Sequence, residues 1–319
     1  MSGTRHVVRQ PGAGSPGQRR ISLVLGSGGA RGLAHIGVIR VLERRGWTIG
    51  TIAGSSMGAL IGGFYAAGKL DDYADWVLDL TEFNVLRFLD IAWGSAGMLK
   101  GQMLMDTLQA FVGQHRIEEL PIPLTIVATD VLSRQEVWLT RGDLFDAIRA
   151  SVAVPTVFTP HMINGRPLLD GGILNPVPIA PTLQDPTDAI IGVSLSGAPR
   201  RSGAGKPPQQ DQRIRQPRHR YRKKIDAFID QLQESLGLGE AEPEKHDGPT
   251  LSFADAALLS LDAMQASIAR CKLAAYPPDL LIEIPINTCG AHEFYRAAEV
   301  IEAGEYWAER ALDRFSEDG

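Results

Sequence analysis

Two successive strand–turn–helix units near the N-terminus constrain the fold more than any other feature of the sequence. The first unit has a short apolar run at residues 21–25, a glycine-rich turn, and apolar residues close to helical spacing between residues 33 and 42. The second unit has an apolar run at residues 48–53, a Gly-Ser turn, and an apolar helix that continues to about Gly68. Short apolar runs bounded by glycine and followed by helical periodicity are typical of buried strands joined by helices.

Further apolar runs extend this alternation along the chain. Strands are expected at residues 124–129, 136–140, 189–194 and 280–284, with helices between them. The pattern predicts an α/β fold with a mostly parallel central sheet that helices cover on both faces. With 319 residues, of which 44% are hydrophobic, the chain can build one large core.

Two segments depart from the pattern. Residues 1–19 are rich in Gly, Pro, Arg and Gln and predict a disordered arm. Residues 198–250 form a basic insertion, in which ten Lys or Arg and one acidic residue, Asp211, lie between Arg200 and Lys224. Apolar residues then follow at helical spacing up to Leu236 and predict an amphipathic helix. Two interpretations stay open: a linker whose helix packs on the core, or peripheral contact of residues 198–236 with an anionic membrane.

Charge and composition exclude several classes of function. The formal net charge is −5, so no nucleic-acid partner is expected. No apolar run reaches the roughly eighteen residues of a membrane span, and residues 1–19 lack the apolar stretch of a secretory signal. We therefore expect a cytoplasmic protein, with the inner membrane surface as the place of any peripheral contact. Cys271 and Cys289 stand far apart and indicate neither a disulfide framework nor a metal site.

The turn after the first strand is a candidate oxyanion hole. Its residues are Gly26, Ser27, Gly28, Gly29, Ala30, Arg31 and Gly32. A dinucleotide-binding loop is excluded, because Arg31 stands where that motif needs glycine and Ser56 stands near the place of its acidic residue. The amides of Gly28, Gly29, Ala30 and Arg31 remain as donors to the negative charge that develops in acyl transfer. The alternative is a turn that only permits close packing of helix and strand.

The turn after the second strand is a candidate nucleophile elbow. Gly54-x-Ser56-x-Gly58 follows a strand and precedes a helix, which is the context that gives this short pattern its meaning. Small flanking residues allow a sharp turn that exposes the serine hydroxyl at the carboxyl end of the strand. The alternative role of Ser56 is to cap the helix that follows.

A carboxylate that could activate the serine occurs at Asp170-Gly171-Gly172. The apolar residues 167–169 and 173–174 flank it, so we place Asp170 on a tight turn between apolar segments. An aspartate has an ordinary pKa of about 3.9 and needs burial to become a base near neutral pH. A plain Asp-Gly turn is the alternative.

The three motifs, in this order, resemble those of the patatin-like phospholipases. The resemblance implies a three-layer α/β/α fold, a Ser56–Asp170 dyad, a lipid or acyl-ester substrate, and neither metal nor organic cofactor. Residues 150–155 match the family's A-S-x-A-x-P element, interpreted as a scaffold turn near the site. Residues 278–282, with a short helix expected from about 294 to 304, are similar to the bacterial branch related to the catalytic domain of neuropathy target esterase. The hydrolase domain thus comprises residues 20–197 and 251–319.

Two other hypotheses remain open at the level of sequence. A triad of Ser56 and Asp170 with His292 would follow the chain order of ordinary α/β-hydrolases, and His161 and His35 are weaker candidates for the same role. A non-catalytic scaffold, whose basic insertion binds a membrane or another partner, is the second hypothesis. Phospholipids, lysophospholipids, acylglycerols and thioesters all remain open as substrates.

Overall fold

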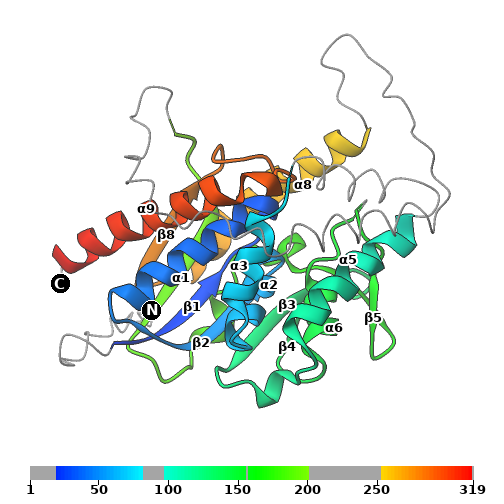
Figure 1. Ribbon diagram of the computed structural model, residues 1–319, viewed down its shortest axis with the longest axis horizontal. Coiled ribbons are helices and arrows are strands. Elements are labelled where there is room, and N and C mark those ends of the chain that lie inside the picture. The colour runs from blue at the N-terminus through cyan, green and yellow to red at the C-terminus, as the bar shows by residue number, and fades with distance from the viewer. Residues whose placement is uncertain (1–18, 82–96, 156, 201–252, 318–319) are drawn as a thin grey trace, which may run out of the picture.

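The computed structural model describes residues 19–81, 97–155, 157–200 and 253–317 (Figure 1). The arm predicted at residues 1–19 therefore lies outside the described residues except for residue 19. The basic insertion predicted at 198–250, with its amphipathic helix, lies outside them except for residues 198–200.

A single eight-stranded sheet forms the centre of the protein. Its order is β5-β6-β3-β2-β1-β7-β8, and β4 also pairs with β3. The strands are β1 Arg20–Leu25, β2 Thr48–Ser55, β3 Leu124–Asp130, β4 Gln135–Leu139, β5 His161–Ile163, β6 Arg166–Asp170, β7 Ala189–Gly197 and β8 Leu280–Pro285. Neighbours among β3, β2, β1, β7 and β8 pair in parallel, whereas β4, β5 and β6 pair antiparallel. The prediction of a mostly parallel sheet is confirmed.

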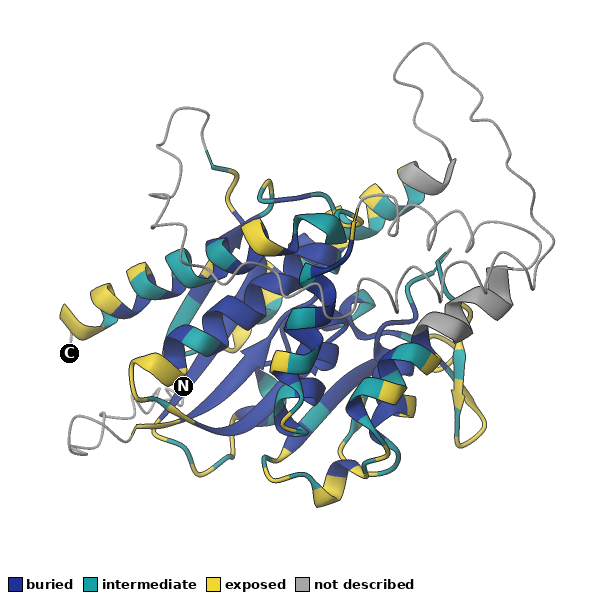
Figure 2. Ribbon diagram, in the orientation of Figure 1, coloured by how far each residue is buried: buried dark blue, intermediate teal, exposed yellow. Residues whose placement is uncertain are grey.

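Helices cover both faces of this sheet, as the three-layer prediction requires. The helices are α1 Ala34–Arg44, α2 Met57–Ala66, α3 Leu70–Leu78, α5 Gly97–Val112, α6 Leu144–Ser151, α8 Phe253–Ala275 and α9 Ala297–Glu317, with 3₁₀ turns at η1 Gly29–Leu33, η2 Ile117–Glu119, η3 Gly171–Ile173, η4 Ala180–Thr182 and η5 Phe294–Arg296. In β1, Leu23 and Leu25 pack into the main core with α1, α2, α6 and α9, whereas Val24 packs on the other face with Ala269 of α8. Strands β1, β2 and β7 are accordingly buried on both faces (Figure 2). Among the described helices, none is both long and apolar enough to cross a bilayer.

The C-terminal helix differs from its prediction. We expected a short helix that ends near Gly304, but η5 is followed by α9, which continues to Glu317. Gly304 does not end the helix. A Cβ atom at this position would lie 2.1 Å from the carbonyl oxygen of Ala34, so the glycine allows α9 to approach α1 closely. The apolar stripe continues past it to Leu312, which is buried.

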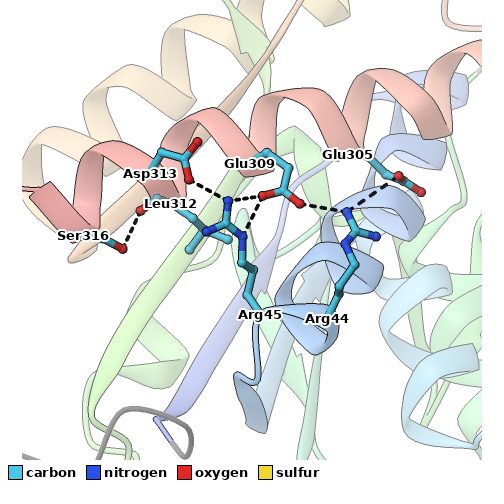
Figure 3. A network of polar contacts seen from close by, with 7 residues as sticks. All are labelled: Arg44, Arg45, Glu305, Glu309, Leu312, Asp313 and Ser316. Carbon is cyan, nitrogen blue, oxygen red and sulfur yellow. Dashed lines mark hydrogen bonds and ion pairs between the residues drawn. The ribbon is translucent and has the colours of Figure 1, made fainter. Parts of the chain in front are cut away.

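Ion pairs join the exposed ends of α1 and α9 beyond this close crossing. Arg44, the last residue of α1, and Arg45, which follows it, bind the carboxylates of Glu305, Glu309 and Asp313 on α9 (Figure 3). Glu309 lies at the centre and accepts hydrogen bonds from both arginines. Because solvent reaches all five side chains, we expect these pairs to add little to the free energy of unfolding compared with the packing of the helices.

A hairpin that the sequence analysis did not anticipate carries Asp170. Strands β5 and β6 pair antiparallel and are joined through Asn164 and Gly165, both of which have positive φ. An Asn-Gly pair between short strands is a strong hairpin signal, and it was present in the sequence. Asp170 is therefore the last residue of a strand rather than part of a turn, which corrects its predicted placement. The turn follows it as η3.

Candidate active site

Strands β2 and β6 meet end to end along one edge of β3. Strand β4 pairs with β3 over residues 126–130, so it occupies the other edge along this whole stretch. On the shared edge, β2 ends with Ser55 opposite Val127, and β6 arrives from the opposite direction and ends with Asp170 opposite Ala128. The residue after β2, Ser56, consequently lies beside Asp170 although the two are 114 positions apart in the chain.

Ser56 occupies a sharp turn between β2 and α2. Its backbone has φ 55° and ψ −122°, a conformation that is costly for a residue other than glycine. A Cβ atom on Gly58 would lie 2.0 Å from the carbonyl oxygen of Leu25, and one on Gly54 would lie 2.5 Å from the oxygen of Gly58. Both flanking glycines are therefore required by close backbone approach. The Ser56 side chain makes no capping hydrogen bond to α2, so the capping interpretation is wrong.

The side chains of Ser56 and Asp170 are joined directly. Ser56 Oγ donates a hydrogen bond of 2.5 Å to Asp170 Oδ2, and the amide of Gly172 donates one of 2.7 Å to Oδ1. Burial raises the pKa of Asp170 to about 6, against the lowering effect of these two hydrogen bonds. The carboxylate is thus ionised near neutral pH and more basic than an ordinary aspartate. It is suited to accept a proton from Ser56.

The backbone around Asp170 is fixed from three sides. Thr129 Oγ1 donates a 2.9 Å hydrogen bond to the Asp170 carbonyl, and the Asp170 amide donates one of 3.0 Å to the carbonyl of Ala153. A Cβ atom on Gly171 would lie 2.1 Å from the carbonyl oxygen of Val127, and one on Gly172 would lie 2.4 Å from the Oγ atom of Ser27. Both glycines after Asp170 are therefore required by close contacts with β3 and with the loop that follows β1.

The glycine loop leaves the sheet next to Ser56. Leu25 at the end of β1 pairs with Gly54 of β2, so residues 26–32 emerge at the same edge of the sheet. Within the described part of the chain, the amides of Gly28 and Gly29 donate to no atom outside η1. The Ala30 amide donates a hydrogen bond of 2.8 Å to the carbonyl of Ala291. This amide is therefore occupied, and the prediction that it is an oxyanion donor is corrected. Gly28 and Gly29 remain as the candidate donors. The Arg31 amide lies inside η1, and its role as a donor stays a prediction.

The other loop residues hold the loop in place. The Gly26 amide donates to the carbonyl of Val193, and a Cβ atom on Gly32 would lie 2.4 Å from Cβ of Met57 at the start of α2. Arg31 is almost fully buried, and its guanidinium pairs with Asp262 of α8 at 2.5 Å and donates to the carbonyl of Ile286 at 3.2 Å. A contact from Ser27 Oγ to Gln265 of α8, at 3.0 Å, adds a second link. Helix α8 thereby anchors the loop.

No hydrogen bond joins the candidate histidines His35, His161 and His292 to the side chains of Ser56 and Asp170 in the described part of the chain. His35 is buried and its Nε2 bonds the carbonyl of Gly26 at 2.8 Å, while burial lowers its pKa to about 4. His161 Nε2 contacts Asp146 at 3.0 Å. Among the described residues, no histidine hydrogen-bonds Ser56 or Asp170, and both Asp170 oxygens already have a partner.

Ser151 contacts the site in a way that the sequence analysis missed. Residues 150–155 were interpreted as a scaffold turn, but Ser151 is the last residue of α6 and its hydroxyl is buried. Ser151 Oγ accepts a 2.9 Å hydrogen bond from the amide of Ser56 and donates a 2.6 Å hydrogen bond to the carbonyl of Val127.

In the described ranges, no group of three or more His, Cys, Asp or Glu side chains is arranged to hold a metal ion.

Comparison with known proteins identifies the family. The family model described as patatin-like phospholipase matches residues 23–183. An uncharacterized NTE family protein of Mycobacterium tuberculosis is 40% identical over 348 residues, which cover 98% of this chain and 95% of that protein. A lysophospholipase NTE1 of Coccidioides immitis is 26% identical over 309 residues, covering 94% of this chain and 18% of that protein. The chain therefore belongs to the patatin-like phospholipase family, as its motifs predicted.

The solved structure of VipD from Legionella pneumophila also aligns with this protein. The alignment has 16% identity and a TM-score of 0.45, and it covers 94% of this chain and 68% of that one. This likeness is too distant to bear on function. Family membership supports a lipid hydrolase activity in general.

Proposed function

We propose that this protein is a serine lipid-acyl hydrolase in which Ser56 is the nucleophile and Asp170 the base. The observation that carries the proposal is the 2.5 Å hydrogen bond that Ser56 Oγ, on a strained turn, donates to the buried carboxylate of Asp170. A serine hydroxyl is a poor nucleophile until a neighbouring group takes its proton. Asp170 is the described group in position to do so.

The acylation step uses both side chains. Ser56 Oγ attacks the carbonyl carbon of the ester while its proton passes to Asp170 Oδ2. The carbonyl oxygen becomes negatively charged, and the amides of Gly28 and Gly29 are the donors that we assign to it. When the intermediate collapses, the bond to the leaving alcohol breaks and the alcohol takes the proton from Asp170. The acyl group is then bonded to Ser56.

Water completes the cycle in the second half of the reaction. Asp170, again ionised, takes a proton from a water molecule that attacks the acyl carbon. The ester bond to Ser56 breaks, the carboxylic acid leaves, and the proton returns to Ser56 Oγ. No histidine is needed in either half, because the same carboxylate serves as base and then as acid.

Two experiments test the proposal. An alkyl fluorophosphonate should label the protein covalently at Ser56, which a non-catalytic scaffold would not allow. Ser56→Ala and Asp170→Asn should each lower kcat by several orders of magnitude in a folded protein, whereas His292→Ala and His161→Ala should retain most activity. A histidine variant as inactive as Asp170→Asn would replace the dyad by a triad.

The substrate class can be narrowed with a lipid panel. The Coccidioides immitis relative is named a lysophospholipase, which makes lysophospholipids the first substrates to test against phospholipids, acylglycerols and thioesters. Ser56→Ala is the control for each lipid. The rate should not change with a chelator, because the proposed reaction uses protein groups alone. A loss of activity that a divalent cation restores would contradict this mechanism.

A further inference from the structure

The hydrogen-bond ladder along β3 is interrupted at the point where β2 and β6 meet. The ladder between β2 and β3 ends at the pair Ser55 and Val127, and the ladder between β6 and β3 begins one residue later at Ala128. The next residue after β2 is Ser56, whose positive φ turns the chain away from the sheet. A buried amide and a buried carbonyl would each lose a partner at this junction.

The hydroxyl of Ser151 fills this gap. It accepts from the Ser56 amide at 2.9 Å and donates to the Val127 carbonyl at 2.6 Å, so one hydroxyl satisfies both groups. The residue is fully buried at the end of α6, which leaves its hydroxyl with these two bonds rather than with solvent. Ser56 can therefore leave the sheet plane without leaving a buried polar group unpaired.

The same short segment also fixes the other partner. Two residues after Ser151, the carbonyl of Ala153 accepts a 3.0 Å hydrogen bond from the amide of Asp170. Residues 151–153 thus hold the backbone of Ser56 through a side chain and the backbone of Asp170 through a carbonyl. The relative position of the two reacting side chains depends on this segment.

We propose that Ser151 is a positioning residue that holds Ser56 in its strained turn and so sets the alignment of the Ser56 hydroxyl with Asp170. The inference rests on the proposed function, since it assigns Ser151 a role in that reaction. Ser151 accepts a hydrogen bond from the Ser56 amide and acts through the Ser56 backbone. Its loss should slow the chemical step and leave substrate binding unchanged.

A matched control is available in Ser22. This serine is also fully buried, and its hydroxyl also makes a short hydrogen bond, 2.7 Å to Thr187 Oγ1. It lies near the start of β1, whereas the site lies beyond the ends of β1 and β2. Ser22→Ala therefore removes a comparable buried hydroxyl without touching the strand ends at the site.

The experiment compares Ser151→Ala, Ser151→Thr and Ser22→Ala by thermal unfolding, by ester hydrolysis and by the rate of fluorophosphonate labelling. For Ser151→Ala we expect kcat and the labelling rate to fall about 100-fold with KM unchanged, the loss that a displacement of about 1 Å can cause. Ser22→Ala should retain the kcat of the native protein. Ser151→Thr, which keeps the hydroxyl, should recover at least about a tenth of native kcat.

Several outcomes would overturn the inference. A folded Ser151→Ala protein with the kcat of Ser22→Ala would do so, as would a folded Ser151→Thr protein as slow as Ser151→Ala. If Ser151→Ala does not fold, Ser151→Cys takes its place with the same expectation, and failure of both to fold would assign the residue to stability alone. The native protein and Ser56→Ala are measured in parallel. An inactive native protein would refute the proposed function itself, which is a different result.

Discussion

Replacement of Asp170 by asparagine should stabilise the protein while abolishing its activity. Burial raises the pKa of this carboxyl from 3.8 to about 6, so the fold holds an ionised group that it disfavours. The difference corresponds to a cost of about 3 kcal/mol above pH 6. Asparagine has nearly the same shape and can keep an acceptor for the Gly172 amide. It carries no charge and cannot take the proton from Ser56.

The sign of the pH dependence makes this prediction specific. Well below pH 3.8 the carboxyl is neutral in the folded and in the unfolded chain, and the substitution should have no electrostatic effect. As the pH rises towards 6, the unfolded chain ionises first and the native protein loses stability. The gain from Asp170→Asn should therefore be about 2 kcal/mol at pH 5 and about 3 kcal/mol at pH 8.

Urea unfolding of both proteins at pH 5 and pH 8 measures these free energies directly. Glu309→Gln is the control, and its effect on the free energy of unfolding should have the opposite sign. The Glu309 carboxylate accepts hydrogen bonds from Arg44 and Arg45, so its loss should destabilise the protein slightly. The reasoning is refuted if the asparagine protein is no more stable than the native one at pH 8, or if its advantage is as large at pH 5 as at pH 8.

Three further predictions follow from other parts of the molecule. The value of kcat/KM for a soluble ester should rise with pH through an apparent pKa near 6, since Asp170 must be ionised to act as base. A kcat/KM that does not change from pH 5 to 8 would exclude Asp170 as the base. Gly304→Ala should lower the free energy of unfolding by about 2 kcal/mol, because its Cβ would lie 2.1 Å from a carbonyl oxygen of α1, whereas Glu309→Gln should cost at most about 1 kcal/mol. Equal losses in urea unfolding would contradict this. Deletion of residues 200–224, which lie outside the described residues except for residue 200, should abolish salt-sensitive sedimentation with anionic vesicles and spare a soluble ester. Equal sedimentation of both proteins would indicate a solvated linker.

The parts of the fold that sequence predicted are those whose requirements are local. The two strand–glycine–helix units were located correctly because Gly54 and Gly58 are needed by backbone atoms of the turn itself and of the adjacent strand. Strand alternation likewise follows from apolar runs that are buried on both faces. The order of the three motifs then led to the family, which the matches confirm.

Contacts between distant segments could not be read in the same way. The amide of Ala30 was expected to face the substrate but donates to Ala291, which is supplied by the loop after β8. The bond between Ser56 and Ser151 joins positions 95 residues apart and has no signal in local periodicity. The helix expected to end near Gly304 continues through it. Glycine disfavours helix, so its place inside α9 follows from the close approach of α1 and not from a local preference.

The antiparallel hairpin of β5 and β6 is what allows a serine and a carboxylate to meet without a third side chain. In a wholly parallel sheet all strand ends point the same way, and a carboxylate would have to return from a loop. Here β6 runs against β2 on the same edge of β3, so the last residue of one strand faces the first residue beyond the other. Both backbones are held by ladder hydrogen bonds up to that point. For the proposed dyad, the sheet itself supplies the orientation that a histidine and its partner supply in a triad, and a buried carboxylate of raised pKa is the cost of that arrangement.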